Sequence, residues 1–116
     1  MGDRAELWIP GRPKPKERPR LGRGRRVYTP QATLDAEARI ADAYIEERLP
    51  LFVGPITVDA EFHHNGIQLV IEEADWKSPL VGDIDNYAKT LLDALQPCAF
   101  ANDRQVVALS SRKMPK

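Results

Sequence analysis

An amphipathic pattern near the C-terminal end constrains the fold of this chain more than any other feature. Apolar side chains recur at steps of three and four residues between Ile84 and Leu95, and Pro97 follows shortly afterwards. This spacing places the apolar side chains along one face of an α-helix, and a proline cannot continue that helix. We therefore predict a helix over residues 84–95 that buries its apolar face in a core.

Two acidic residues stand at the start of this predicted helix. Asp83 directly precedes it, and Asp85 shares with Lys89 the face that points away from the apolar stripe. In one interpretation, Asp83 caps free backbone amides and Asp85 forms an ordinary surface ion pair with Lys89. In the other, both carboxylates bind Mg²⁺, which prefers oxygen ligands and often takes only one or two carboxylates from a protein.

A third acid, Asp103, follows the predicted helix. The helix carries the chain about 18 Å away from Asp83 at about 1.5 Å per residue. The segment 96–103, if extended, spans about 23 Å at about 3.3 Å per residue, which is enough to return. The spacing therefore allows a cluster of three carboxylates, but it does not decide between a helix cap and a metal site.

The net charge of zero hides a strong asymmetry along the chain. The first 29 residues have nine basic and three acidic side chains, a net charge of +6, and the remaining residues have eight basic and fourteen acidic ones, a net charge of −6. Prolines and glycines interrupt the basic residues of segment 10–26, which predicts an extended loop. A basic arm on an acidic body is expected where one part holds a polyanion and another gathers carboxylates for a metal ion. A solvated tail on a solubilising surface is the alternative.

The N-terminal half contains two further predicted elements. Residues 5–9 form a short strand that stops at Pro10. A helix follows, with Thr33 as its N-cap, and Leu49-Pro50 ends it. The expected apolar face of this helix consists of Leu34, Ala38, Ala41 and Ile45.

Three predicted strands complete the sheet. Residues 56–62 alternate apolar and polar side chains, Asn65-Gly66 marks a hairpin turn, and residues 67–71 return. Residues 105–109 form the last strand. The order β-α-β-β-α-β predicts an α+β fold, with a mixed sheet and helices packed against it in a single domain over residues 1–116.

The composition argues against a disulfide-stabilised secreted protein and against a membrane-spanning one. Cys98 is the only cysteine, so no disulfide can form within the chain, and a cytosolic setting fits. No segment resembles a signal peptide or approaches the roughly 20 apolar residues of a membrane span. His63 and His64 are adjacent and point to opposite faces of a strand, so they make a poor joint metal site. We expect a soluble cytoplasmic protein.

Three segments of the chain carry a family resemblance. Gly82-Asp83-Ile84-Asp85-Asn86-Tyr87-Ala88-Lys89, Leu92-Asp93-Ala94-Leu95 and Asn102-Asp103-Arg104-Gln105-Val106 resemble the RusA family of Holliday junction resolvases. The N-terminal segments Pro13–Arg20 and Tyr28-Thr29-Pro30 and the terminal Lys113-Met114-Pro115 are also similar to that family. The resemblance covers nearly the whole chain.

This resemblance implies a homodimeric endonuclease of bacterial or phage origin. Such an enzyme uses Mg²⁺, or Mn²⁺ as a substitute, to cut four-way DNA junctions by paired symmetric nicks. By the same resemblance, Asp83, Asp85 and Asp103 match the metal-binding acids and Lys89 the functional lysine. Asn102 departs from the pattern, because many members have a second acid there. The residues expected to bind DNA are Arg12, Lys14, Lys16, Arg18, Arg20, Arg23, Arg25, Arg26 and Lys113.

Two other functions remain open at this point. The chain could be a non-catalytic DNA-binding or architectural protein that kept the basic arm, although the intact Asp83, Asp85, Lys89 and Asp103 argue against this. It could also be a less selective nuclease of flaps or replication forks. Tyr28 and Trp76 are candidates for stacking on bases, but packing within the protein is the simpler interpretation of both.

Overall fold

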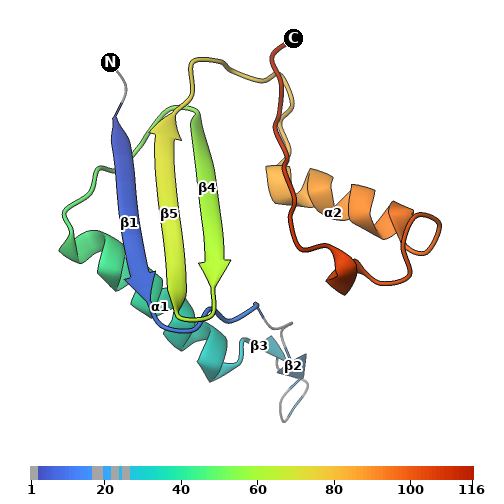
Figure 1. The fold of residues 1–116 in the computed structure, drawn as a ribbon, viewed down its shortest axis with the longest axis horizontal. Coiled ribbons are helices and arrows are strands. Elements are labelled where there is room, and N and C mark those ends of the chain that lie inside the picture. The colour runs from blue at the N-terminus through green and yellow to red at the C-terminus, as the bar shows by residue number, and fades with distance from the viewer. Residues whose placement is uncertain (1–2, 17–19, 22–23, 25–26) are drawn as a thin grey trace. The chain divides into compact units, whose positions relative to one another are not determined.

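The computed structural model describes residues 3–16, 20–21, 24 and 27–116. Its elements are β1 (Arg4–Pro10), β2 (Arg20–Leu21), β3 (Val27–Tyr28), α1 (Gln31–Glu46), β4 (Ile56–His63), β5 (Gly66–Glu73), α2 (Ile84–Leu95) and the short 3₁₀ helix η2 (Asp103–Gln105). These elements fall into two units (Figure 1). The first unit, Met1–Ala74, holds the strands and α1, and the second, Asp75–Lys116, holds α2 and η2.

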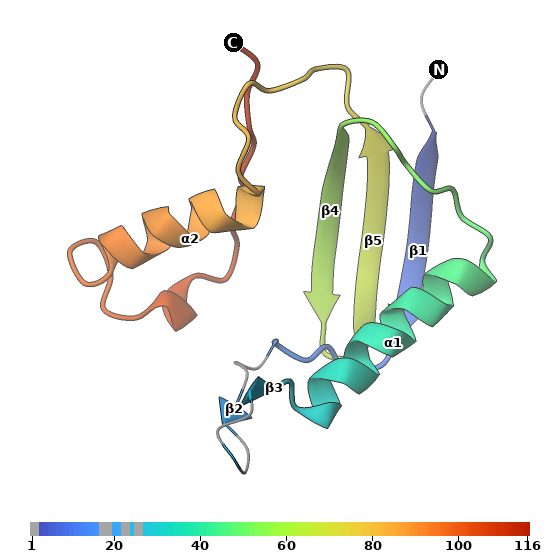
Figure 2. The same ribbon diagram turned by 180° about the vertical axis from the view of Figure 1, so that it is seen from behind.

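An antiparallel sheet of three strands forms the centre of the first unit. Its order is β1-β5-β4, and β4 and β5 form a hairpin. Figure 2 shows α1 crossing one face of this sheet. Alternation along β1 puts Leu7 and Ile9 on that face, where they are buried with Ile67. Ile40 and Tyr44 of α1 pack against these three residues and close the core.

The three strands of this sheet and the hairpin confirm the sequence predictions, but the turn lies one residue earlier than expected. The register pairs His63 with Gly66, so His64 and Asn65 form the turn. Gly66 instead lies in β5 under the ring of Trp8, where an added Cβ would be 2.2 Å from Trp8 Cζ2. This glycine therefore serves the close approach of an aromatic ring.

The start and the buried face of α1 differ from the prediction. Pro30 is the N-cap, and Thr33 lies inside the first turn, where its amide donates to the Pro30 carbonyl at 3.1 Å. The prediction of Thr33 as N-cap is therefore wrong. The predicted apolar face is also wrong, because Leu34 and Ile45 are 45% and 69% exposed. The side chains that α1 turns toward the sheet are Thr33, Ala36, Ile40, Ala43 and Tyr44.

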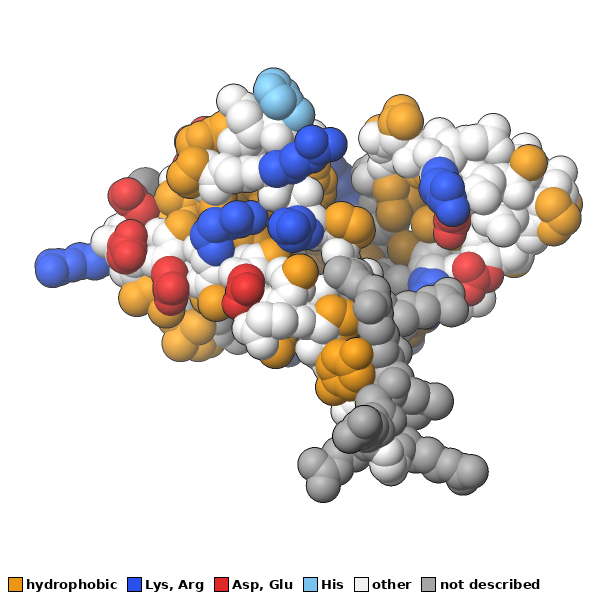
Figure 3. All heavy atoms as spheres, turned by 90° about the horizontal axis from the view of Figure 1, so that it is seen from below, with side chains coloured by type: hydrophobic (Ala, Val, Ile, Leu, Met, Phe, Trp, Pro, Cys, Tyr) orange, Lys and Arg blue, Asp and Glu red, His pale blue; other side chains and the backbone are white. Residues whose placement is uncertain are grey.

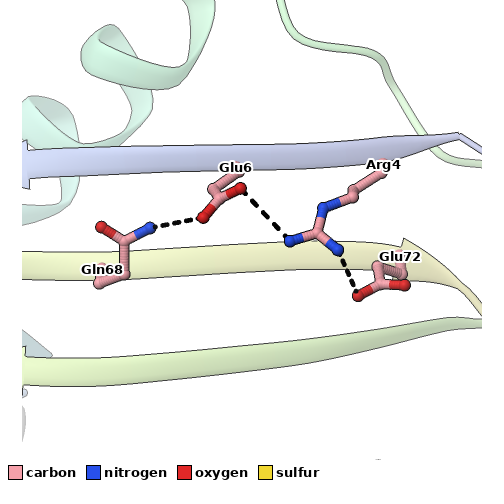
Figure 4. Close-up of polar contacts among 4 residues, drawn as sticks. All are labelled: Arg4, Glu6, Gln68 and Glu72. Carbon is pink, nitrogen blue, oxygen red and sulfur yellow. Dashed lines mark hydrogen bonds and ion pairs between the residues drawn. The ribbon is translucent and has the colours of Figure 1, made fainter.

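Four polar side chains on the other face of the sheet link β1 to β5 (Figure 4). Arg4 donates to Glu72 at 3.2 Å and to Glu6 at 3.3 Å, and Gln68 donates to Glu6 at 3.3 Å. Because these side chains are about half exposed, each ion pair contributes only about 0.2–1 kcal/mol. Their main effect is to favour one register, since Arg4 and Glu72 are directly opposite in the β1–β5 ladder.

The second unit confirms the predicted helix and corrects the predicted last strand. α2 spans Ile84–Leu95, the range that the apolar spacing predicts. The strand expected over residues 105–109 is absent from the described chain: η2 occupies Asp103–Gln105, and residues 106–116 are extended without a strand partner. The α+β class is confirmed, but the sheet is antiparallel throughout rather than mixed.

Half of the apolar face of α2 is exposed, and the other half, consisting of Ala88, Leu92 and Leu95, is partly buried. Ile84, Tyr87 and Leu91 are 40%, 43% and 55% exposed, and no residue of α2 is buried. Figure 3 shows hydrophobic side chains on the surface of both units. Besides α2, η2 is the only helix or strand in the second unit, whose residues are all described. Neither α1 nor α2 is long and apolar enough to cross a lipid bilayer.

Candidate active site

Gly82 fixes the entry of the chain into α2. Its amide donates to the hydroxyl oxygen of Tyr87 at 3.2 Å, and the Tyr87 ring lies so close that a Cβ on Gly82 would be 2.9 Å from Cε2. A side chain at this position would push the ring away. The turn that leads into Asp83 and the first turn of α2 are therefore packed against each other.

Asp83 is the N-cap residue of α2, but its carboxylate does not cap the helix. The backbone at Asp83 is extended, with φ −70° and ψ 141°, and its carbonyl accepts from the amides of Asn86 and Tyr87 at 3.1 and 3.2 Å. The side chain makes no capping hydrogen bond. The capping interpretation of this carboxylate therefore fails, and its oxygens are free to bind another ligand.

Asp85 and Lys89 lie on the exposed side of α2. Asp85 is in the first turn, where the helix dipole favours a negative charge. Lys89 follows one turn later, but within the described part of the chain neither residue takes part in an ion pair. The surface ion pair between Asp85 and Lys89, which the sequence also allows, is therefore not formed. Asp83, Asp85 and Lys89 together present two carboxylates and one ammonium group to solvent.

Asp103 begins η2 and is tied to the end of α2. Its amide donates to Oε1 of Gln96, the C-cap residue of α2, at 2.8 Å. Asn102 caps η2: its side chain accepts from the amide of Arg104 at 2.9 Å, while Oε1 of Gln105 accepts from the Asn102 amide at 2.9 Å. This reciprocal arrangement is a capping box. The side-chain oxygen at position 102 therefore has a structural role, but an aspartate could accept the same bond, so the cap does not explain the asparagine.

The structure does not gather the three predicted acids at one point. Asp103 is anchored beside the residue that ends α2, whereas Asp83 precedes the helix. Among the described residues, no group of three or more His, Cys, Asp or Glu side chains is placed to hold a metal ion. Asp83 and Asp85 nevertheless fit Mg²⁺ by their chemistry, because they offer two exposed carboxylates without competing partners, and Mg²⁺ commonly takes only one or two.

Lys113 connects the C-terminal segment to the turn before α2. Its ammonium donates to the carbonyl oxygens of Leu80 and Gly82 at 3.2 and 3.0 Å. Its own carbonyl accepts from Nε1 of Trp76 at 2.8 Å. The Trp76 indole thus has a hydrogen bond within the protein. The Lys113 ammonium lies beside Gly82, the residue that precedes Asp83.

The basic arm belongs to the first unit, and the structure describes part of it. Arg12 and Lys14 are exposed, and Lys16 forms an exposed ion pair with Glu37 at 3.6 Å. The arm is not entirely a loop, because β2 and β3 pair antiparallel, with Arg20 opposite Tyr28. Four of the predicted DNA-binding residues lie outside the described residues: Arg18, Arg23, Arg25 and Arg26.

Three side chains at the site were not singled out from the sequence. Tyr87 was assigned to the apolar stripe, yet its hydroxyl accepts from Gly82. Gln96 and Gln105 hold Asp103 and Asn102 through their amide oxygens. The spacing of Asn102 and Gln105 is a readable capping-box signal, since the two residues are three apart. The contacts of Tyr87 and Gln96 have no comparable local signal.

Comparison with known families gives the class of the protein. Residues 10–116 match a family of DNA-cutting enzymes described as endodeoxyribonuclease RusA. This match defines the chain as an endodeoxyribonuclease. The chain belongs to the RusA family, in agreement with the motifs at Gly82–Lys89 and Asn102–Val106. No curated protein and no solved structure matches the chain.

Proposed function

We propose that this RusA-family endodeoxyribonuclease resolves four-way DNA junctions by paired nicks that depend on Mg²⁺. The observation that carries the proposal is the state of the two carboxylates at the start of α2. Asp83 and Asp85 are exposed, Asp83 is not used as a cap, and neither is in an ion pair with the described residues. Two unpaired carboxylates two residues apart are available to Mg²⁺, which commonly takes one or two carboxylates from a protein.

Asp83 and Asp85 would hold the metal ion, and Asp103 is the third acid that the motif resemblance implies. A bound divalent ion polarises a phosphoryl oxygen, lowers the pKa of a water molecule and neutralises the leaving oxygen, and Mn²⁺ can replace Mg²⁺ in these tasks. Lys89 would stabilise the charge that builds on the phosphate.

The basic arm would hold the phosphate backbones of the junction. Arg12 and Lys14 are exposed and free to contact phosphate, and they lie in the segment with the highest density of basic residues. Phosphate contacts position DNA without reading its sequence, which suits an enzyme that recognises branched structure. The same contacts weaken steeply as salt is added.

A homodimer is the assembly that this reaction favours. A four-way junction has approximately two-fold symmetry and two strands to cut, so a two-fold dimer presents one site to each strand. The exposed apolar face of α2 is compatible with association, since exposed apolar patches commonly mark interfaces. We propose that the dimer acts in the cytoplasm of a bacterial cell, where recombining DNA is found.

The direct test is incubation of the protein with a synthetic four-way junction in Mg²⁺ and in EDTA. We expect symmetric paired nicks in Mg²⁺ and none in EDTA. Equal cleavage of a replication fork or a flap would favour the less selective nuclease instead. Binding of the junction without nicking in Mg²⁺ or Mn²⁺, by folded protein, would favour the architectural alternative.

A further inference from the structure

The turn before α2 is held by side chains rather than by its own backbone. Among the described residues, no backbone–backbone hydrogen bond is formed by residues 75–82. The amide of Leu80 donates to the hydroxyl of Ser78 at 3.2 Å, and the amide of Gly82 donates to Tyr87 at 3.2 Å. The remaining bonds to this turn come from Lys113 and Trp76. Its conformation therefore depends on a few side chains.

Lys113 makes the largest contribution to this arrangement. Its ammonium has three donors, and two of them meet the carbonyl oxygens of Leu80 and Gly82. Its main-chain carbonyl accepts from the Trp76 indole, so Lys113 is bound at both ends of the turn. The ammonium is partly buried and, within the described chain, forms no ion pair with an acid. Hydrogen bonds from a charged donor are stronger than neutral ones, so this contact is well suited to fix backbone geometry.

The bond to Gly82 acts directly on Asp83. The Gly82 carbonyl belongs to the planar peptide unit that also contains the amide and the Cα of Asp83. Holding this oxygen in place therefore fixes the orientation of the peptide plane between Gly82 and Asp83. The other side of Gly82 is fixed as well, because its amide donates to Tyr87. The clamped glycine therefore restricts the position of the Asp83 Cα, from which the carboxylate extends and from which α2 and Asp85 follow.

We propose that Lys113 is a positioning residue for the carboxylates of Asp83 and Asp85, and that it does not act as a contact to DNA phosphates. This inference rests on the proposed metal-binding role of those carboxylates. A ligand pair must be held within about 0.5 Å of its productive geometry, and groups behind the ligands supply that precision. Loss of such a supporting contact typically weakens metal binding by about 10- to 100-fold.

The test measures metal binding without DNA. Free Mn²⁺ is followed by electron paramagnetic resonance during titration of the full-length protein, of Lys113→Met and of Lys116→Met. The matched control, Lys116, is an exposed lysine three residues further on. We expect about tenfold weaker Mn²⁺ binding or more for Lys113→Met, no change for Lys116→Met, and affinity nearer to the wild type for Lys113→Arg, which keeps the charged donors.

Junction binding in EDTA separates the two roles of Lys113. If Lys113 only positions the carboxylates, Lys113→Met leaves the junction affinity unchanged. If Lys113 contacts phosphate, the substitution lowers that affinity. Unchanged Mn²⁺ affinity in Lys113→Met, with or without weaker junction binding, would overturn the inference. Circular dichroism checks the fold, and if Lys113→Met is unfolded the same criteria apply to Lys113→Gln, whose shorter amide cannot reach both carbonyls. If the wild type itself does not bind Mn²⁺, the proposed metal site fails rather than the role of Lys113 alone.

Discussion

At the scale of single residues, the start of α2 is organised by contacts that leave the acids free. The Asp83 carbonyl, rather than its carboxylate, receives the first amides of the helix, and Gly82 is held by Tyr87 and Lys113. The backbone is thus satisfied without using the carboxylates of Asp83 and Asp85. Both carboxylates are therefore available to the metal ion that we propose.

A substitution of Lys89 tests the chemistry of the proposed site. Lys89→Met removes the ammonium but keeps the length of the side chain, and the residue is exposed without an ion pair among the described residues, so the fold should not change. We expect the nicking rate with saturating Mg²⁺ and junction to fall by about 100-fold, the usual cost of one charge-stabilising contact. Single-turnover cleavage measures this rate. A rate within about twofold of the wild type would remove Lys89 from the reaction.

At the scale of elements, local patterns predicted some features well. α2 was predicted to the residue because its apolar spacing is regular and Pro97 ends it. The capping acid was harder to interpret, because an aspartate before a helix suits a cap and a metal equally well. The observed absence of a side-chain capping bond rules out the cap for Asp83, and the metal site stays a prediction.

Other features depend on partners that are distant in the sequence. In α1, alanines lie on both candidate faces, and the larger Ile40 and Tyr44 decide which face meets the sheet. Residues 105–109 have the composition of a strand, but a strand also needs a neighbour to pair with, and no local pattern supplies that information. The anchoring of Asp103 to Gln96 is likewise a tertiary contact that spacing cannot reveal.

Gly66 gives a prediction for the sheet. Gly66→Ala would place a Cβ at 2.2 Å from the Trp8 ring, so the ring must move away from β5. We expect a loss of about 1–3 kcal/mol in the free energy of unfolding, the range for an overpacked site. Urea denaturation measures it. Gly54→Ala is the matched control, since nothing lies within 4 Å of its added Cβ. Equal stabilities of the two variants would show that Trp8 does not occupy this place.

At the scale of the whole molecule, our proposal assigns DNA binding and DNA cleavage to segments of opposite charge. The arm carries the net positive charge, and the acids of the proposed site lie in the second unit. Substitutions in the basic arm should therefore weaken junction binding, and substitutions of the acids should slow nicking. The two functions can be tested independently by variants in each segment.

Salt dependence tests the arm. Replacing Arg12 and Lys14 together with alanine removes two exposed positive charges. We expect the slope of log Kd against log salt concentration to become shallower by about 1.8, since each neutralised phosphate contributes about 0.9. Binding to a four-way junction in EDTA between low and moderate salt gives the slope. An unchanged slope would mean that these two side chains do not contact phosphates.

The most direct measurement of the central claim compares binding and nicking in Asp85→Asn. This substitution keeps the size of the side chain but removes the charge that would bind the metal ion. We expect junction affinity in EDTA to equal that of the wild type, and the nicking rate in Mg²⁺ to fall by at least about 100-fold, as for the loss of a preorganised electrostatic contact. Nicking at the wild-type rate by Asp85→Asn would contradict the metal site that we propose at the start of α2.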